Sequence, residues 1–223
     1  SYINISDIRY GGIPMYKVQI NKTTFRNHIH YDWWKYLVGI LTTMFIWNLA
    51  VTMTRPQTPA DKKLDIYMVG DYMLQEATKP VSDKILEDFP ELLEANFFNI
   101  SLVGDMEYVG RTQLMVMIGS QTGDIYAFSE EEFKIMAEQG AFTPLDEYIE
   151  EFEEIVPREK LEKYKYTALE EGEHYFGVPM DGIKLFEDTG YDVSNKVMGV
   201  MAYSKNQEKA IEALKWFLKN GSK

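Results

Sequence analysis

The stretch DIYAFSEEEFKIMAEQG, residues 124–140, decides the fold class because it holds a strand, a turn and a helix in succession. Residues 124–128 form a β-prone run, as in a buried strand. Ser129 and Glu132 have the spacing of a capping box, in which the serine oxygen accepts a backbone N–H of the first helical turn while the glutamate reaches back. Gly140 is placed to end the helix. The stretch therefore predicts one strand-to-helix unit.

The same alternation continues through residues 64–223. Short β-prone runs are followed by apolar residues at helical spacing, which predicts an α/β domain of three layers, a mostly parallel sheet covered by helices on both faces. The expected strands are 64–69, 97–103, 124–128, 175–179 and 197–203. The expected helices are 80–89, a short one through 114–118, 130–139, an acidic one capped by Asp146, one from Pro157 to Gly172, and 207–220.

An uncharged apolar run extends from Tyr36 to Met53, entered through Trp33-Trp34-Lys35 and followed by Arg55. At about 1.5 Å per residue it spans roughly 27 Å, close to the hydrocarbon core of a bilayer at about 30 Å. A buried helix of a soluble domain would be shorter and broken by polar positions. A cleaved signal peptide fits less well, because the run begins far into the chain and exceeds a usual apolar region. We therefore expect one transmembrane helix over residues 33–53.

Charge divides the chain near the same place. Residues 1–63 hold eight Lys and Arg against three Asp, whereas residues 64–223 hold 15 against 32, a net of −17. A surface this acidic tells against a nucleic-acid partner. The absence of cysteine excludes disulfides and a lipidated cysteine anchor. Cations flank the apolar run on both sides, so the positive-inside rule favours a cytoplasmic N-terminus only slightly.

Four regions follow from these observations. Residues 1–32 are expected to be a basic tail, with at most a hairpin or an edge strand around the alternating run Met15–Ile20. Residues 33–53 form the transmembrane helix. Residues 54–63 contain two prolines and few apolar side chains, which is typical of an extended tether. Residues 64–223 form one domain with enough apolar residues for a core.

Several motifs of the large domain occur together in one known family. Residues 124–129 and 139–146 (QGAFTPLD) are similar to a D-V-Y and G-x-L-x-P-L-D signature. Residues 175–179 match a G-V-P strand, and residues 209–218 (KAIEALKWFL) match an A-A-x-x-F-x-x-F-L helix. In this order the motifs resemble the type II extracellular solute-binding proteins, the ligand receptors of ABC importers. The resemblance implies an extracellular α/β lobe and a transporter partner.

The chain departs from that family at one point. Its members have two lobes, and the second lobe is built between the G-V-P strand and the strand before the lysine-rich helix. Here only seventeen residues, Met180–Lys196, separate Pro179 from Val197. The interval is too short for a second lobe. We therefore expect a single lobe without the cleft that closes on a ligand in the family.

Candidate contact residues come from topology, because ligands of open parallel sheets bind beyond the carboxyl ends of the strands. Each such residue also has a structural alternative as a cap, a turn or a sheet edge, and the same edge could receive a protein. The candidate ligand contacts are Asp71, Tyr72, Phe128, Ser129, Met180, Asp181 and Tyr203. The candidate contacts between the membrane helix and a partner helix are Gly39, Thr42, Thr43 and Asn48, although threonine can instead bond its own helix backbone.

Two functions of different classes remain. The first is a membrane-anchored, extracellular accessory or docking subunit of a transporter-type complex, bound to a polytopic membrane protein. The alternative is a reduced but working receptor that binds a small solute for an ABC importer. An enzyme is not expected, because no nucleophile, phosphate-loop or dinucleotide fingerprint is present. No cofactor or metal is expected either: His174 lacks a second ligand at zinc spacing, and the acidic run 146–154 lacks a calcium loop.

Overall fold

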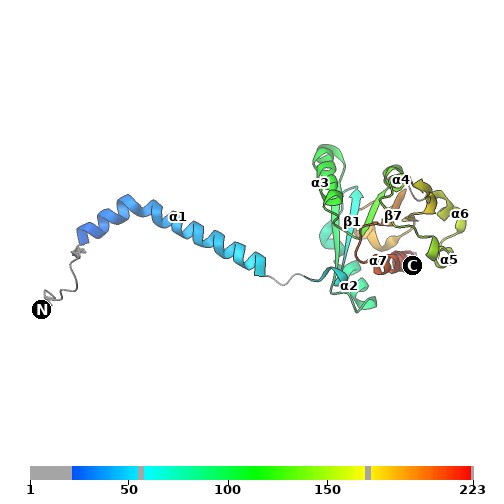
Figure 1. Ribbon diagram of the computed structural model, residues 1–223, viewed down its shortest axis with the longest axis horizontal. Coiled ribbons are helices and arrows are strands. Elements are labelled where there is room, and N and C mark those ends of the chain that lie inside the picture. Colours follow the sequence, from blue (N-terminus) through cyan, green and yellow to red (C-terminus); the bar gives the residue numbers. More distant parts are fainter. Residues whose placement is uncertain (1–21, 55–57, 169–171, 222–223) are drawn as a thin grey trace. The chain divides into compact units, whose positions relative to one another are not determined.

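The computed structural model describes residues 22–54, 58–168 and 172–221, with side chains from Trp33 onward. The chain divides into two compact units between Gln57 and Thr58. The first contains one long helix, α1 (Lys22–Thr54), drawn in blue in Figure 1. Its segment Trp33–Thr54, 22 residues, is long and apolar enough to cross a membrane. At 1.5 Å per residue this segment measures about 33 Å.

α1 begins earlier than the sequence predicted. Residues 22–32, expected to be part of a tail, belong to the helix, since no proline or glycine interrupts the chain between Lys22 and the apolar segment. The alternating run Met15–Ile20 lies outside the described residues. The described side chains of the apolar segment are exposed almost throughout.

The second unit is built on a five-stranded sheet of order β2-β1-β3-β7-β6. β1 pairs in parallel with β2 and with β3, whereas β7 is antiparallel to both of its neighbours. The sheet is therefore mostly parallel, with one reversed strand, and the predicted fold class is confirmed. The strands are β1 (Lys63–Gly70), β2 (Glu94–Ser101), β3 (Ile125–Ser129), β6 (Val178–Pro179) and β7 (Lys196–Val200).

Helices cover both faces of the sheet, and Figure 1 shows the resulting layers. Side chains alternate along β1, so that Ile66 and Met68 join the core under α2 and α7, while Tyr67 and Val69 join the core under α3 and α4. The helices that form these layers are α2 (Lys79–Asp88), α3 (Glu107–Gly119), α4 (Glu130–Glu138) and α7 (Gln207–Gly221). Each of the four overlaps a predicted helix.

The region after α4 differs most from expectation. It contains two 3₁₀ turns, two short helices and a hairpin, namely η4 (Asp146–Tyr148), α5 (Ile149–Glu153), α6 (Arg158–Leu161), η5 (Glu162–Tyr164), β4 (Lys165–Ala168) and β5 (Gly172–Tyr175). The predicted helix from Pro157 to Gly172 is wrong beyond Leu161. Lys165–Ala168 pairs antiparallel with Gly172–Tyr175 instead, and the ring of Tyr166 contacts Phe133 at 6.3 Å between centroids. Packing against α4 thus overrides the helical pattern.

Three shorter predicted features also change. The expected strand 175–179 is divided between β5 and β6 at Gly177, whose backbone passes so close to α4 that an added Cβ would lie 2.5 Å from the Phe133 ring. Asp146 does not cap a helix, since it is the first residue of η4 and its carboxylate contacts His174. β2 begins and ends somewhat before the predicted 97–103.

The predicted tether of residues 54–63 is shorter in the structure. A 3₁₀ turn, η1 (Ala60–Lys62), precedes β1, and Asn206 donates its amide hydrogens to the carbonyls of Ala60 and Lys63. Lys209 also donates to the carbonyl of Asp61 at 2.6 Å. The second half of the predicted tether is therefore part of the folded unit.

The connection from β6 to β7, residues 180–195, stays inside the same unit. It contains one 3₁₀ segment, η6 (Lys184–Thr189), and its apolar side chains fill the core beneath α7. Phe186 lies 5.9 Å from the ring of Phe217, and Tyr191 donates its hydroxyl to the carbonyl of Val69 at 2.8 Å.

Candidate functional site

The carboxyl ends of β1 and β3 meet the start of β7 at one edge of the sheet, where the sequence placed most candidate contacts. Asp71, just after β1, pairs with the Lys196 ammonium of β7 at 2.9 Å. The Lys196 side chain is only 10% exposed, and its ammonium also lies 5.6 Å from the centre of the Tyr191 ring. Such a lysine is tolerated inside a protein only because a carboxylate partner and an aromatic face accompany it.

Gly70 makes this arrangement possible. It has a φ of +115°, and a Cβ added there would lie 2.7 Å from the Lys196 nitrogen. The ammonium therefore occupies the space directly above the end of β1. Because this is the position at which open parallel sheets receive ligands, the chain fills part of its own expected site.

The loop after β1 is fixed by Asn99 of β2. Its side-chain amide donates to the carbonyls of Met68 and Asp71, at 3.1 and 2.8 Å, and its oxygen accepts the N–H of Met73 at 3.2 Å. Tyr72 lies between these held residues and is 64% exposed. The edge thus presents one exposed aromatic side chain on a backbone that is hydrogen-bonded on either side.

The other candidates of this edge have structural roles. Phe128 and Met180 are enclosed in the core, with 1% and 0% of their surface exposed. Ser129 caps α4, since its hydroxyl oxygen accepts the Glu132 N–H at 3.4 Å. The Glu132 carboxylate lies 3.1 Å from the same hydroxyl, so it reaches the serine side chain rather than the serine amide. Asp181 accepts the backbone N–H of Asn195 at 3.0 Å.

Tyr203 lies at the opposite edge, contrary to the expected placement. The prediction assumed that β7 runs with its neighbours, but β7 is antiparallel, so the residues that follow it meet the start of β3. Tyr203 donates to the carbonyl of Thr122 at 3.0 Å. It lines a pocket of about 210 Å³ together with Lys63, Asp65 and Asp124.

Two buried carboxylates form one wall of this amino-edge pocket. Asp65 pairs with Lys63 at 2.7 Å, and Asp124 accepts a hydrogen bond from Ser204 at 2.6 Å and another from the Asp65 backbone at 2.9 Å. Burial raises the pKa of Asp124, whereas the hydrogen bond to Asp65 raises the pKa of Lys63. Each carboxylate already has an ion-pair or hydrogen-bond partner within the domain. The cluster therefore links β1, the residue before β3 and the turn before α7.

A second pocket, of about 440 Å³, lies beside His174 and includes Tyr148 and Ile211. The His174 Nδ1 is 2.9 Å from an Asp146 carboxylate oxygen, and the two side chains are about one-third exposed. Within the described residues, no group of three or more His, Cys, Asp or Glu side chains is arranged to hold a metal ion.

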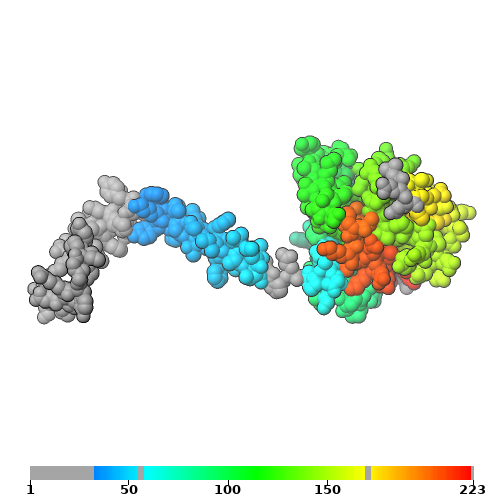
Figure 2. All heavy atoms as spheres, in the orientation of Figure 1, coloured from blue at the N-terminus to red at the C-terminus, as the bar shows by residue number. Residues whose placement is uncertain are grey.

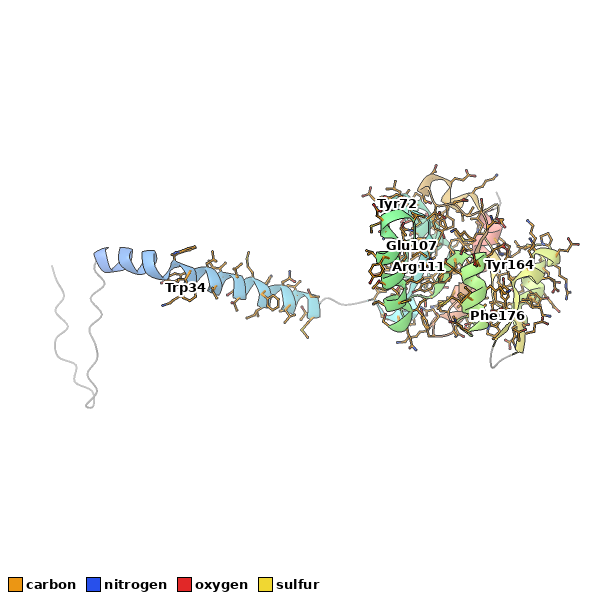
Figure 3. The ribbon with its side chains drawn as sticks, turned by 90° about the horizontal axis from the view of Figure 1, so that it is seen from above. Trp34, Tyr72, Glu107, Arg111, Tyr164 and Phe176 are labelled. Atoms are coloured by element: carbon orange, nitrogen blue, oxygen red, sulfur yellow. The ribbon has the colours of Figure 1, made fainter. Side chains whose placement is uncertain are left out.

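The candidate residues of α1 are exposed on the surface of the described helix. A Cβ added at Gly39 would meet no heavy atom within 4 Å, so the surface there can accept close approach of another helix. Thr43 donates to the Gly39 carbonyl at 2.9 Å, and the Asn48 carbonyl accepts the Thr52 hydroxyl at 2.8 Å. Figure 3 shows the side chains of this segment, with Trp34 labelled at its start.

Sequence reasoning missed the principal ion pair of the carboxyl edge. Lys196 was not a candidate because a lysine before a strand usually lies at the surface. The one available signal was its position, a single cation entering the otherwise apolar strand KVMGV. Asn99 was missed for a different reason: its hydrogen-bond partners lie on β1 and in the loop after it, and they become visible only when β1 and β2 are paired.

Comparison with known proteins gives structural likeness only. No protein-family model matches the sequence, and no curated protein matches it. Among solved structures, an extracellular solute-binding protein family 1 member from Alicyclobacillus acidocaldarius aligns with a TM-score of 0.41 and 14% identity, over 55% of this chain and 29% of that one. The N-glycan transport solute-binding protein of Streptococcus pneumoniae aligns at 0.40 and 16%, over 54% and 25%.

A third structure, an ABC substrate-binding protein of Listeria monocytogenes in complex with cycloalternan, aligns with a TM-score of 0.37 and 18% identity, over 52% of this chain and 28% of that one. The chain thus spans less than a third of the length of these proteins.

Proposed function

We propose that this protein is a membrane-anchored, extracellular accessory or docking subunit of a transporter-type membrane complex, with a domain that resembles one lobe of a solute-binding protein. The supporting observation is the use of residues 180–195. They run directly from β6 to β7 and bury their apolar side chains in the core of the same unit. Because residues 180–195 pack into the core of the same unit, they do not form a second lobe that could close over a solute.

Two further features agree with this proposal. The apolar segment of α1 has the length of a membrane span. At the carboxyl edge, the Lys196 ammonium fills space beside Asp71 that a small ligand would need. The first feature supports a membrane anchor, and the second disfavours capture of a small solute at this edge.

The test is purification of the full chain from its native membrane in a mild detergent, followed by quantitative mass spectrometry. We expect a polytopic membrane protein in constant ratio to the chain. The matched control is the chain without residues 58–223, which keeps the anchor and lacks the folded domain. A ratio that is the same for both would show that the domain does not dock.

A second measurement separates the receptor alternative. Calorimetric titration of the full chain with common sugars and short peptides should give weak or no binding. A submicromolar dissociation constant, about −8 kcal/mol or better, would overturn the docking function and support a reduced receptor.

The anchor itself contributes under this proposal. Asn48→Leu preserves size and apolar length, so insertion should persist while any hydrogen bond from Asn48 to a partner helix is lost, at about 0.6 to 2 kcal/mol. If the Asn48→Leu complex is as abundant and as detergent-resistant as the original, α1 is only an anchor and all specificity lies in residues 58–223.

A further inference from the structure

We propose that the outward surface of α3 and of the turn before it is the docking surface of this domain, and that its partner is a protein surface with an apolar centre and a basic rim. We call this surface the α3 face. The proposal rests on the proposed function, because it names the site by which a docking subunit would engage its complex. The α3 face consists of Val103, Met106, Tyr108, Val109, Met115 and Val116.

Exposure sets this surface apart from the rest of the domain. Tyr108 is 83% exposed and Met115 is 74% exposed. Within the described part of the domain, ten large apolar side chains are exposed, and six of them belong to the α3 face. Single exposed apolar residues are ordinary, but their concentration on one helix and the turn before it is typical of an interaction surface.

α3 is apolar on two sides, and the domain covers only one. Leu114, Met117 and Ile118 pack against the sheet. Tyr108 and Met115, seven residues apart, share the opposite side of the helix, and Val109 and Val116 repeat the same spacing beside them. Apolar residues that recur on one side of a helix are normally covered by a partner. The uncovered side therefore has the pattern of a helix-packing seam whose partner is another protein.

The seam is presented on a firm support. Gly110, in the middle of the inner side, lets α3 approach so closely that an added Cβ would lie 2.0 Å from the Ser101 carbonyl oxygen at the end of β2. Figure 2 shows α3, in green, as a ridge that projects from the body of the domain. A projecting, firmly held helix is accessible to a partner helix that packs along its seam.

Charge decides which partner fits. The only cation between residues 103 and 119 is Arg111, and it is already paired with Glu107 at 3.0 Å and with Glu132 of α4 at 3.4 Å. Figure 3 labels Glu107 and Arg111 on α3. Asp105 adds a further exposed negative charge at the start of the helix. The rim of the α3 face is therefore net negative, and a partner with lysine or arginine around its apolar centre is complementary to it.

The same charge disfavours the other occupants. A second copy would bring together two domains that each carry a net charge of −17 over residues 64–223. An anionic lipid surface would meet the same repulsion. A basic-rimmed protein surface is the one occupant that both the apolar seam and the acidic rim favour.

The test uses residues 58–223, a compact unit that contains both cores, after its cooperative unfolding has been verified. Its binding to two fluorescent helical peptides is measured by anisotropy. Both peptides have the same leucine seam, but one has lysine flanks and the other glutamate flanks. We expect the lysine-flanked peptide to bind at least tenfold more tightly, and this difference to shrink as salt is added.

The double variant Tyr108→Ser with Met115→Ser should weaken binding of the lysine-flanked peptide at least tenfold. The matched control is Leu93→Ser with Ile135→Ser, which removes two other exposed apolar side chains, 59% and 51% exposed, and should leave binding unchanged. Equal binding of the two peptides, or equal loss in the two double variants, would overturn the proposal. Reversible dimers in sedimentation, or flotation with phosphatidylserine vesicles, that depend on Tyr108 and Met115 would also overturn it by naming another occupant.

The outcome is separable from that of the proposed function. If the full chain with Tyr108→Ser and Met115→Ser retains its polytopic partner in the original ratio, the α3 face is not the docking surface, although the docking function stands. If neither the original chain nor the variant retains a partner, the docking function fails, and the peptide titration alone then decides whether the α3 face binds a basic-rimmed helix.

Discussion

Lys196 and Asp71 are buried to very different extents, with side chains 10% and 38% exposed. Loss of Asp71 and loss of Lys196 should therefore lower the free energy of unfolding by different amounts, because an unpaired charge is penalised in proportion to its burial. Asp71→Ala leaves the buried ammonium unpaired and should lower the free energy of unfolding by about 2 to 3 kcal/mol. Lys196→Met leaves a carboxylate that water can reach, and should cost about 1 kcal/mol.

Urea unfolding of the two single variants and of the double variant measures this asymmetry. The double variant should be more stable than Asp71→Ala alone, since it removes the stranded charge. Equal costs for the two single variants would contradict the assignment of Lys196 as the more buried partner.

The tyrosines of the two cores make stability depend on alkaline pH. Burial raises the pKa of Tyr67 to about 12 and also raises the pKa of Tyr191. The folded chain thus keeps protons that the unfolded chain loses, so the stabilisation is fully present below the ordinary tyrosine pKa of about 10 and is lost as pH rises through the folded pKa. We expect the free energy of unfolding to fall from about pH 10 upward.

Tyrosinate absorbance and urea unfolding, followed together across this range, check the expectation. Tyr191→Phe removes one of these groups and the hydroxyl that donates to the Val69 carbonyl, so it should flatten part of the fall while costing about 1 kcal/mol at neutral pH. A free energy of unfolding that stays constant to about pH 12 would be inconsistent with buried tyrosines.

At the scale of elements, the position of α3 depends on one glycine. Gly110→Ala would place a Cβ 2.0 Å from the Ser101 carbonyl oxygen, so the helix must shift away from β2 at a cost of about 2 kcal/mol or more. Gly119→Ala lies in the same helix with nothing within 4 Å, and should be neutral or stabilising by up to about 1 kcal/mol. Thermal unfolding of both variants gives the comparison. Similar shifts of both midpoints in the same direction would show that α3 does not rest on Ser101.

The elements that sequence predicted best are those with a complete local signal. The strand and capped helix of residues 124–138 and the amphipathic helix α7 each combine periodicity with a start or stop residue. The hairpin of β4 and β5 was missed because residues 165–168 are too few to show a period, and their pairing is set by contact with α4. Local pattern also says nothing of strand direction, so Tyr203 was assigned to the wrong edge.

Strand topology predicted the position of the candidate site but not the side chains that fill it. The rule for parallel sheets located the edge at Asp71 and Tyr72, but the filling of that edge by Lys196 requires the pairing of β3 with β7. The α3 face was equally hidden, since a short apolar helix has the same sequence signature whether one side or both sides are covered. Burial, rather than composition, distinguishes the two cases.

At the scale of the whole molecule, the proposed function requires α1 to lie within the bilayer and residues 58–223 to lie outside the cell. We therefore expect residues 1–35 to be cytoplasmic and residues 54–223 external. The net charge of −17 on residues 64–223 keeps such a domain soluble beside an anionic membrane, because like charges repel.

Protease added to intact cells should remove the large domain and spare the N-terminal tail, as followed by antibodies against tags at each end. Cells opened by mild lysis serve as the control, in which both ends should become accessible. Alkaline carbonate should leave the chain in the membrane fraction, since a spanning helix is held by its apolar length and not by charge. A large domain that is protected in intact cells, or a chain that appears in the medium cut after Thr54, would contradict the anchored topology. The second result would identify the apolar segment as a signal sequence and require the α3 face to find its partner from solution.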